Sequence, residues 1–280
     1  MTNNEKVKYI DKQIQRTASK HRAAVLRVIR GYGQTLLKSL DKNSPQTVLY
    51  NIPYLMPVEP MRDALLMLWL DASVKFTNIT ARQLGNKPKY NYNEFQLKLD
   101  PRIVLAELLQ QNPELEALYM DLFSYFQGVG GARVVTIVDT YRTQGEKAIK
   151  QALEDITSLG VGEKEGAQLL NRYIEDKWKG SLFQAERIVR TETHAAANTS
   201  SLNEAINTGA NVVKIWGTYV DKRTRTTHLA AIGQERELSQ AFNVGGALLY
   251  TPGVLHSEES EDHPEETINC RCTVLYKRKV

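Results

Sequence analysis

Cysteine is scarce in this sequence. Its 280 residues contain two cysteines, Cys270 and Cys272, in a single Cys-x-Cys pair. Two residues cannot supply the network of crosslinks that stabilises small secreted domains, and a disulfide between such close neighbours would be strained. The cysteine content therefore favours a reducing compartment, and we expect assembly in a cytoplasm.

Long apolar runs are also missing. The longest candidate, residues 64–70, is bounded by Asp63 and Asp71 and falls far short of the ~18 residues that a membrane-spanning helix needs. The first six residues lack the apolar core of a secretion signal. We therefore expect no membrane partner during assembly.

Several enzyme signatures are absent as well. The sequence contains no Gly-rich phosphate-binding loop, no Gly-x-Ser-x-Gly and no His-Glu-x-x-His. Its composition, 42% hydrophobic and 24% charged residues, is typical of a folded globular protein of one large domain or two ordinary ones. We predict a protein that is not an enzyme, with no catalytic residue and no cofactor beyond a candidate zinc ion discussed below.

Positive charge is concentrated near the beginning of the chain. Residues 1–50 contain ten Lys and Arg against three carboxylates, whereas the whole chain has a net charge of +4. Such a segment could face nucleic acid or an acidic protein surface, or it could be the solvated face of a helix. The candidate contact residues are Lys12, Arg16, Arg27 and Arg30.

Apolar residues recur every three to four positions over most of residues 6–206, which predicts helices. A Gly31-Tyr32-Gly33 step favours a kink in the first helix, and four prolines between residues 45 and 60 break up the stretch that follows. Gly128-Val129-Gly130-Gly131 is typical of a hinge or a turn. The predicted helices cover residues 6–40, 59–81, a segment that opens at Asp100-Pro101, 134–158, a shorter segment to 178, and 181–206.

The pattern changes after Gly209. Residues 212–220 are β-branched and aromatic and predict a strand, residues 224–232 predict a short helix, and residues 236–238, 248–250 and 272–276 predict further short strands. The fold class is therefore α+β: a mainly α-helical N-terminal part followed by a small α+β C-terminal domain with a short sheet. We place the helical region at 1–160 and the α+β domain at 161–280.

Two groups in the C-terminal part could carry chemistry. In Asp221-x-Arg223-x-Arg225-x-x-His228, the Asp and His suit acid/base work or metal binding. A structural interpretation stands beside this one: Asp221 caps the next helix, an Arg pairs with a carboxylate, and His228 packs under the sheet.

The second group is Asn269-Cys270-Arg271-Cys272. On a strand, the alternation of side chains places Cys270 and Cys272 on one face. Two thiolates there could bind zinc with His228, the fourth ligand coming from His194, His256 or His263. The spacing differs from the usual Cys-x-x-Cys, and buried thiols acting as small apolar side chains are an equal alternative. A metal-dependent hydrolase or nuclease that uses Asp221, His228, Cys270 and Cys272 is the second functional hypothesis.

A third group lies on the predicted helix 181–206. Arg190 and His194 are four residues apart and share a face, whereas Glu192 points elsewhere. Arg190 and Glu192 could form a buried pair that locks this helix to the sheet.

Taken in order, these pieces resemble a known family. The series is Arg190-Thr191-Glu192-Thr193, Lys214-x-Trp216, Asp221-x-Arg223-x-Arg225-x-x-His228, Phe242 with Gly245-Gly246, Tyr250-x-Pro252-Gly253, and Asn269-Cys270-Arg271-Cys272. Over roughly residues 130–276 it resembles the phage Mu F-like head morphogenesis family, the minor head proteins of tailed bacteriophages. Thr251 and Val254 depart from the family pattern, which runs Tyr-Pro-Gly-Asp here.

The resemblance implies a capsid-assembly role. Family members associate with the portal vertex inside the virion head, in few copies, and contact packaged DNA in some cases. The expected partners are therefore portal protein, other capsid proteins and phage DNA, with the helical region 1–160 contacting portal or DNA. The resemblance also implies that the Asp/Arg/His and Asn-Cys-Arg-Cys positions are the framework of the C-terminal domain. We interpret the signature residues as structural rather than catalytic.

Overall fold

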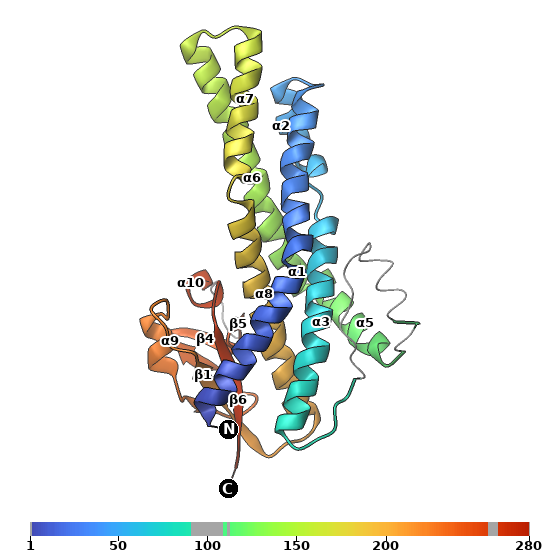
Figure 1. The fold of residues 1–280 in the computed structure, drawn as a ribbon, viewed down its shortest axis with the longest axis vertical. Helices are drawn as coiled ribbons and strands as arrows, with labels where there is room; N and C mark the ends of the chain where they lie inside the picture. Colours follow the sequence, from blue (N-terminus) through green and yellow to red (C-terminus); the bar gives the residue numbers. More distant parts are fainter. Residues whose placement is uncertain (1, 91–108, 111–112, 257–262, 280) are drawn as a thin grey trace. The chain divides into compact units, whose positions relative to one another are not determined.

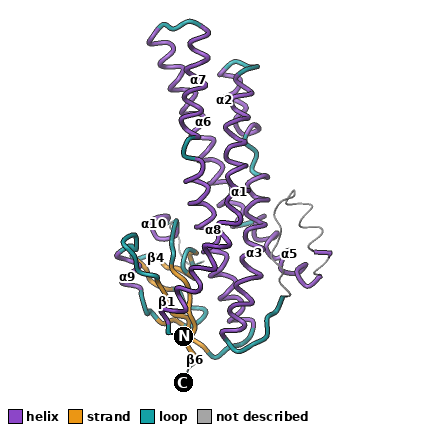
Figure 2. Tube along the Cα trace, viewed as in Figure 1, coloured by secondary structure: helices purple, strands orange, loops and turns teal. Residues whose placement is uncertain are grey.

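A computed structural model describes residues 2–90, 109–110, 113–256 and 263–279. The predicted α+β class is confirmed: helices fill most of the described chain, and all strands lie between residues 212 and 278 (Figures 1 and 2). The predicted helix opening at Asp100-Pro101 falls outside the described residues. No helix in the described ranges is both long and apolar enough to cross a bilayer.

The chain forms two compact units. Unit 1 comprises Met1–His21, Met67–Met120 and Arg187–Val280, and unit 2 comprises Arg22–Leu66 and Asp121–Glu186. Each unit thus takes residues from both sequence ranges, 1–160 and 161–280. Residue 160 itself, where we placed the domain boundary, is the left-handed glycine that ends helix α6, Val129–Leu159.

Unit 2 is built from helices. Helix α6 packs against α7, Glu163–Trp178, and against α2, Pro45–Leu55. The predicted break is present at Pro57, which lies between α2 and the next helix, whereas Pro45 and Pro53 lie within α2 and do not end it. Pro45 occupies the first turn, where no backbone N–H is needed, and Ser44 caps the helix by accepting a hydrogen bond from the Thr47 N–H at 3.2 Å. Pro53 lies in the last turn before Met56.

Helix α1, Asn3–Leu40, runs without a break through Gly31 and Gly33. The helix is not interrupted at these glycines, and Gly33 has a packing role. A Cβ at Gly33 would lie 2.8 Å from the indole of Trp178 on α7, and that indole donates a hydrogen bond to the Ile29 carbonyl at 2.7 Å. The glycines at 128–131 likewise form a close approach between α5, Glu116–Gln127, and α6, since a Cβ at Gly131 would meet the Phe126 carbonyl oxygen at 2.4 Å.

Unit 1 contains two small antiparallel sheets. In the first, β1 (Val212–Thr218) lies between β2 (Glu235–Arg236) and β6 (Cys272–Arg278). The second has the order β3 (Phe242–Val244), β4 (Ala247–Thr251), β5 (Val254–Leu255). Strand β1 and the short helix α9 (Thr226–Ala231) agree with the predicted strand and helix. The sequence did not predict β3 and β5, which are three and two residues long.

Helices cover the sheets of unit 1. In α8 (Ser181–Asn207), the residues from Thr191 to Asn198 are buried. The Asn198 side chain donates to the carbonyls of Pro252 and Cys272 at 3.0 and 3.1 Å and accepts from the Val274 N–H at 3.0 Å. One buried amide thus joins α8 to β6 and to the loop after β4. Helix α3 (Glu59–Gln83) adds Trp69, whose indole donates to Glu192 on α8 at 3.0 Å.

Candidate functional site

His228, Cys270 and Cys272 come together in the core of unit 1. The His228 Nδ1 atom lies 3.2 Å from Cys272 Sγ and 3.8 Å from Cys270 Sγ. His228 comes from α9, Cys272 is the first residue of β6, and Cys270 is in the turn before it. Asn269 turns the chain there with a left-handed φ of 59°, which brings both sulfurs to the same ring.

Glu266 is a fourth member of the cluster around His228 and was not predicted from the sequence. It lies on the short helix α10 (Pro264–Thr267), is buried, and places Oε2 at 2.8 Å from His228 Nε2. The Thr227 hydroxyl donates to the same oxygen at 2.9 Å. The only hint in the sequence is that the acidic stretch 258–266 precedes the cysteines. The two ring nitrogens of His228 therefore face opposite kinds of partner, a carboxylate and two sulfurs.

The surroundings shift the pKa values of the two thiols in opposite directions. Burial alone would raise the pKa of Cys272, but hydrogen bonds from Cys270, His228 and Thr218 outweigh it and lower that pKa. The hydrogen bond to Cys272 and burial raise the pKa of Cys270. One sulfur is thus favoured as the thiolate and the other as its donor. Both lie in an apolar cluster with Trp216 and Phe242, and all three residues of the His/Cys group are at most 2% exposed.

Asp221 is placed differently from His228. Its carboxylate accepts the backbone N–H of Arg223 at 2.8 Å and the Arg271 guanidinium at 2.7 Å. The hydrogen bond from the Arg223 backbone is the main cause that holds the pKa of Asp221 far below its usual range. Arg225 donates to the Ile268 carbonyl at 2.7 Å. In the described chain, the group of possible metal ligands around His228 consists of His228, Cys270 and Cys272 and does not include Asp221.

The signature residues of α8 bind the neighbouring elements. Arg190 donates to the Asn269 side chain at 2.9 Å, and the Asn269 N–H donates to the Thr191 hydroxyl at 2.9 Å. Glu192 accepts from Trp69, as described above. His194 is fully buried, and this burial lowers its pKa to about 4, so that the ring is neutral at pH 7. The turn that carries both cysteines is therefore fastened to α8.

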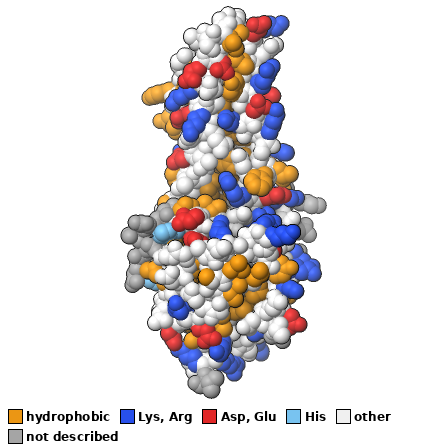
Figure 3. All heavy atoms as spheres, turned by 90° about the vertical axis from the view of Figure 1, so that its left-hand side faces the viewer, with side chains coloured by type: hydrophobic (Ala, Val, Ile, Leu, Met, Phe, Trp, Pro, Cys, Tyr) orange, Lys and Arg blue, Asp and Glu red, His pale blue; other side chains and the backbone are white. Residues whose placement is uncertain are grey.

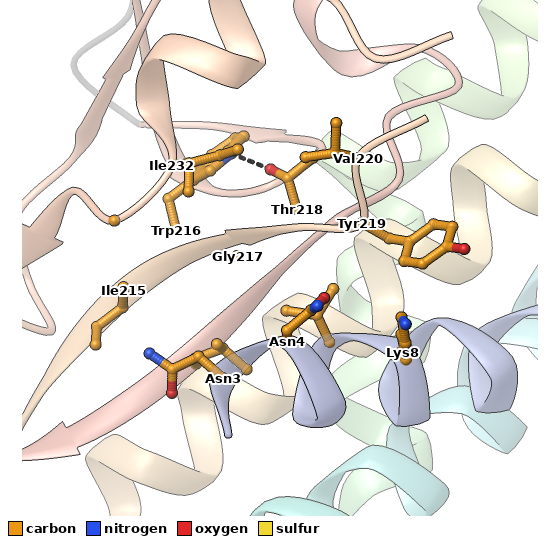
Figure 4. A pocket seen from close by; sticks show the side chains of 13 residues that line it. Asn3, Asn4, Lys8, Ile215, Trp216, Gly217, Thr218, Tyr219, Val220 and Ile232 are labelled. Atoms are coloured by element: carbon orange, nitrogen blue, oxygen red, sulfur yellow. Dashed lines mark hydrogen bonds between the residues drawn. The ribbon is translucent and has the colours of Figure 1, made fainter. Parts of the chain in front are cut away.

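A cavity of about 490 Å³ lies between the first turns of α1 and strand β1 (Figure 4). Asn3, Asn4 and Lys8 line one side, and Gly217, Thr218 and Tyr219 line the other. Gly217 allows the close approach, because a Cβ there would lie 2.9 Å from Val7.

Thr218 connects this cavity to the His/Cys cluster. Its hydroxyl accepts from the Trp216 indole at 3.1 Å, the hydrogen bond drawn in Figure 4, and donates to Cys272 Sγ at 3.2 Å. The sequence did not predict the cavity, because its walls come from opposite ends of the chain.

The four basic residues predicted to contact DNA or protein are exposed on α1. Lys12 and Arg16 lie one turn apart in unit 1, and Arg27 and Arg30 lie one turn apart in unit 2. Within the described chain none of the four is paired with a carboxylate. On the face shown in Figure 3, by contrast, Lys and Arg lie interspersed with Asp and Glu over α6 and α7. The two pairs on α1 are the better candidates for binding a polyanion.

Comparison with known proteins confirms the family resemblance. Residues 142–275 match the family model described as "Phage Mu protein F like protein". The chain is 29% identical over 150 residues to the NAD(+)–arginine ADP-ribosyltransferase EFV of Enterococcus faecalis, covering 52% of this chain and 29% of that protein. It is 26% identical over 121 residues to minor head protein GP7 of Bacillus phage SPP1, covering 42% of this chain and 37% of that protein.

The matched segments therefore span less than two fifths of either relative. No solved structure matches the chain.

Proposed function

We propose that this chain, whose residues 142–275 carry a domain of the phage Mu F-like family, is a minor head protein of a phage. The observation that carries the proposal is the family match together with the similarity to a minor head protein. In this role it resides in the virion head, contacts other capsid proteins, and acts in head morphogenesis at the portal vertex.

A structural role suits the His/Cys cluster better than catalysis. A hydrolase needs its metal ligands or nucleophile at a surface that substrate can reach. His228, Cys270 and Cys272 are at most 2% exposed, and Asp221 is engaged by two arginines away from them. The transferase activity in the name of the enterococcal relative belongs to that protein, of which this chain covers 29%. We therefore propose a protein without enzymatic activity.

The portal contact is proposed to lie on the helical part of the chain. On α2, Tyr50 and Tyr54 are 82% and 80% exposed and stand one helical turn apart. Tyrosines of this kind provide large contact areas at low entropic cost and are frequent hot spots of protein interfaces. They offer a portal protein a rigid apolar edge that is already presented by a packed helix.

The test is capture of the full chain by the portal protein of the same phage. Wild-type chain is expected to co-purify with portal at low copy number, and Tyr50→Ala/Tyr54→Ala is expected to weaken capture about tenfold or more, as for loss of a hot spot. Tyr219→Ala, which removes an exposed tyrosine from unit 1, is the matched control and should bind as wild type does.

Two results would count against the proposal. If wild-type chain does not bind portal at all, the portal role is wrong. If the double variant binds as tightly as wild type while the wild-type interaction is intact, the docking surface lies elsewhere and the α2 assignment is wrong.

We also propose that the chain contacts packaged DNA through α1. The exposed pairs Lys12/Arg16 and Arg27/Arg30 carry charge that no carboxylate in the described chain neutralises. Affinity from such residues comes from release of counterions by phosphates and therefore depends strongly on salt.

A further inference from the structure

We propose that His228, Cys270 and Cys272 bind one zinc ion, which fixes α9 to the start of β6. This inference concerns the stability of unit 1 and does not depend on the proposed portal role. It rests on ligand geometry, on the second partner of the histidine, and on the hydrogen bonds around the sulfurs.

The distances suit a zinc ion. With bonds of about 2.3 Å to sulfur and 2.0 Å to nitrogen, a tetrahedral site holds its ligand atoms roughly 3.5–3.8 Å apart. His228 Nδ1 lies 3.2 Å from one sulfur and 3.8 Å from the other, and all three atoms lie within 4.8 Å of one another. An ion therefore needs only small side-chain adjustments to reach three ligands.

The second nitrogen of His228 has the partner that zinc-bound histidines usually have. Metal-ligating histidines donate their other N–H to a carboxylate or carbonyl, which fixes the ring and its tautomer. Glu266 Oε2 accepts that hydrogen bond at 2.8 Å and is itself held by Thr227. With its Nε2 proton donated to Glu266, His228 would release its Nδ1 proton on zinc binding and direct the Nδ1 lone pair at the ion between the two sulfurs. Close packing fixes Glu266, since a Cβ at Gly245 would lie 2.4 Å from its other oxygen.

Each sulfur has a hydrogen-bond donor beside it, as suits a metal-bound thiolate. The Thr218 hydroxyl donates to Cys272 Sγ at 3.2 Å, and the Cys272 N–H points at Cys270 Sγ at 3.5 Å. Two thiolates neutralise the charge of Zn²⁺, so that binding places no net charge in the core. Zinc binding forms two Zn–S bonds and releases two protons to solvent, one from the Cys270 S–H group and one shared by the hydrogen-bonded pair of Cys272 and His228.

The site is structural because of its burial. His228 comes from α9, whereas Cys270 and Cys272, 42 and 44 residues later in the chain, come from the turn before β6 and from the first residue of β6. A zinc ion that binds the folded chain and not the unfolded chain stabilises the folded state by mass action. We therefore expect unit 1 to lose stability when the ion is removed.

The experiment measures metal in the full chain purified without chelators. Elemental analysis of wild type should give about one zinc per chain, and Cys272→Ser and His228→Gln should reduce this at least about fivefold. His263→Gln is the matched control: it removes a histidine whose side chain contacts Glu265 and which is not part of the cluster, and this variant should retain the zinc. Chelation should lower the melting temperature of wild type, and added zinc should restore it.

Cobalt substitution covers the case in which the variants fail to fold. Wild-type chain loaded with Co²⁺ should show the intense visible bands and sulfur-to-metal charge transfer of a tetrahedral thiolate site. Wild type that takes up no zinc from an equimolar solution, or that melts at one temperature with and without chelator, would overturn the proposal. A cobalt spectrum without thiolate bands, or a Cys270–Cys272 disulfide found by mass spectrometry, would also overturn it. None of these results affects the portal assay.

Discussion

Lys214 is a buried charge, and its burial was not predicted from the sequence, where it appears only in the motif Lys214-x-Trp216. It lies on β1, is fully buried, and donates to the Tyr250 carbonyl at 2.8 Å. Its ammonium also lies 5.1 Å and 4.7 Å from the ring centres of Phe242 and Tyr250. The side chain therefore links the first sheet to the second across the core of unit 1.

Because of the buried Lys214, we expect the free energy of unfolding to depend on pH. Burial lowers its pKa from 10.5 to about 8 in the folded chain. Between these values the unfolded chain binds more protons, so the free energy of unfolding rises with pH across this window, by about 1–2 kcal/mol. Urea titrations at about pH 7.5, 8.5 and 9.5 should show this rise in wild type and not in Lys214→Met.

The exposed Lys277 on β6 provides the control for that measurement. Lys277→Met removes a lysine from the same sheet without removing a buried charge, and it should keep the wild-type slope. Parallel pH profiles for wild type and Lys214→Met would show that the ammonium is not the cause.

At the scale of elements, α1 offers two glycines in contrasting places. A Cβ at Gly33 would lie 2.8 Å from the Trp178 indole, whereas a Cβ at Gly31 would meet nothing within 4 Å. Gly33→Ala should therefore cost about 1–3 kcal/mol by forcing Trp178 away from the Ile29 carbonyl. Gly31→Ala should gain about 0.5–1 kcal/mol, because alanine favours the helix.

Thermal unfolding of the two variants tests whether Trp178 packs against Gly33. The comparison is internally matched, because both changes add one methyl group to the same helix two residues apart. Equal effects of the two substitutions would contradict the packing of Trp178 against Gly33.

The elements differ in how far the sequence predicts them. Long helices such as α1 and α6 follow from their repeat of apolar residues, which local spacing alone encodes. Helix α2 was missed because its prolines were taken as breaks, although Pro45 stands in the first turn, which tolerates proline, and the helix continues through Pro53. Strands β3 and β5 are too short to show an alternating pattern and depend on pairing with β4.

The candidate site around His228 is likewise only partly predictable from the sequence. His228, Cys270 and Cys272 are recognisable by residue type, but their meeting point is set by the left-handed Asn269 and by the antiparallel pairing of Thr218 with Cys272. Glu266 reaches the ring from a four-residue helix. The cavity at β1 needs the first turns of α1, more than 200 residues away in sequence. Such long-range contacts leave no local pattern.

For the whole molecule, the division into two units separates the basic residues of α1 into two pairs. Lys12 and Arg16 belong to unit 1, and Arg27 and Arg30 belong to unit 2. Neutralising one pair therefore tests one unit at a time. This design is sharper than a truncation, which would remove the first turns of α1 from their contact with β1 at Gly217.

The expected readout is the salt dependence of binding to double-stranded DNA. Each phosphate contact contributes about 0.9 to the slope of log affinity against log salt. Replacing both residues of a contacting pair by Gln should therefore lower the slope by about 2 and weaken binding to all sequences alike. Lys164→Gln/Lys177→Gln, on exposed positions of α7, removes the same charge and should leave the slope unchanged. Binding that does not respond to salt, or a slope that neither α1 variant reduces, would show that α1 does not contact DNA.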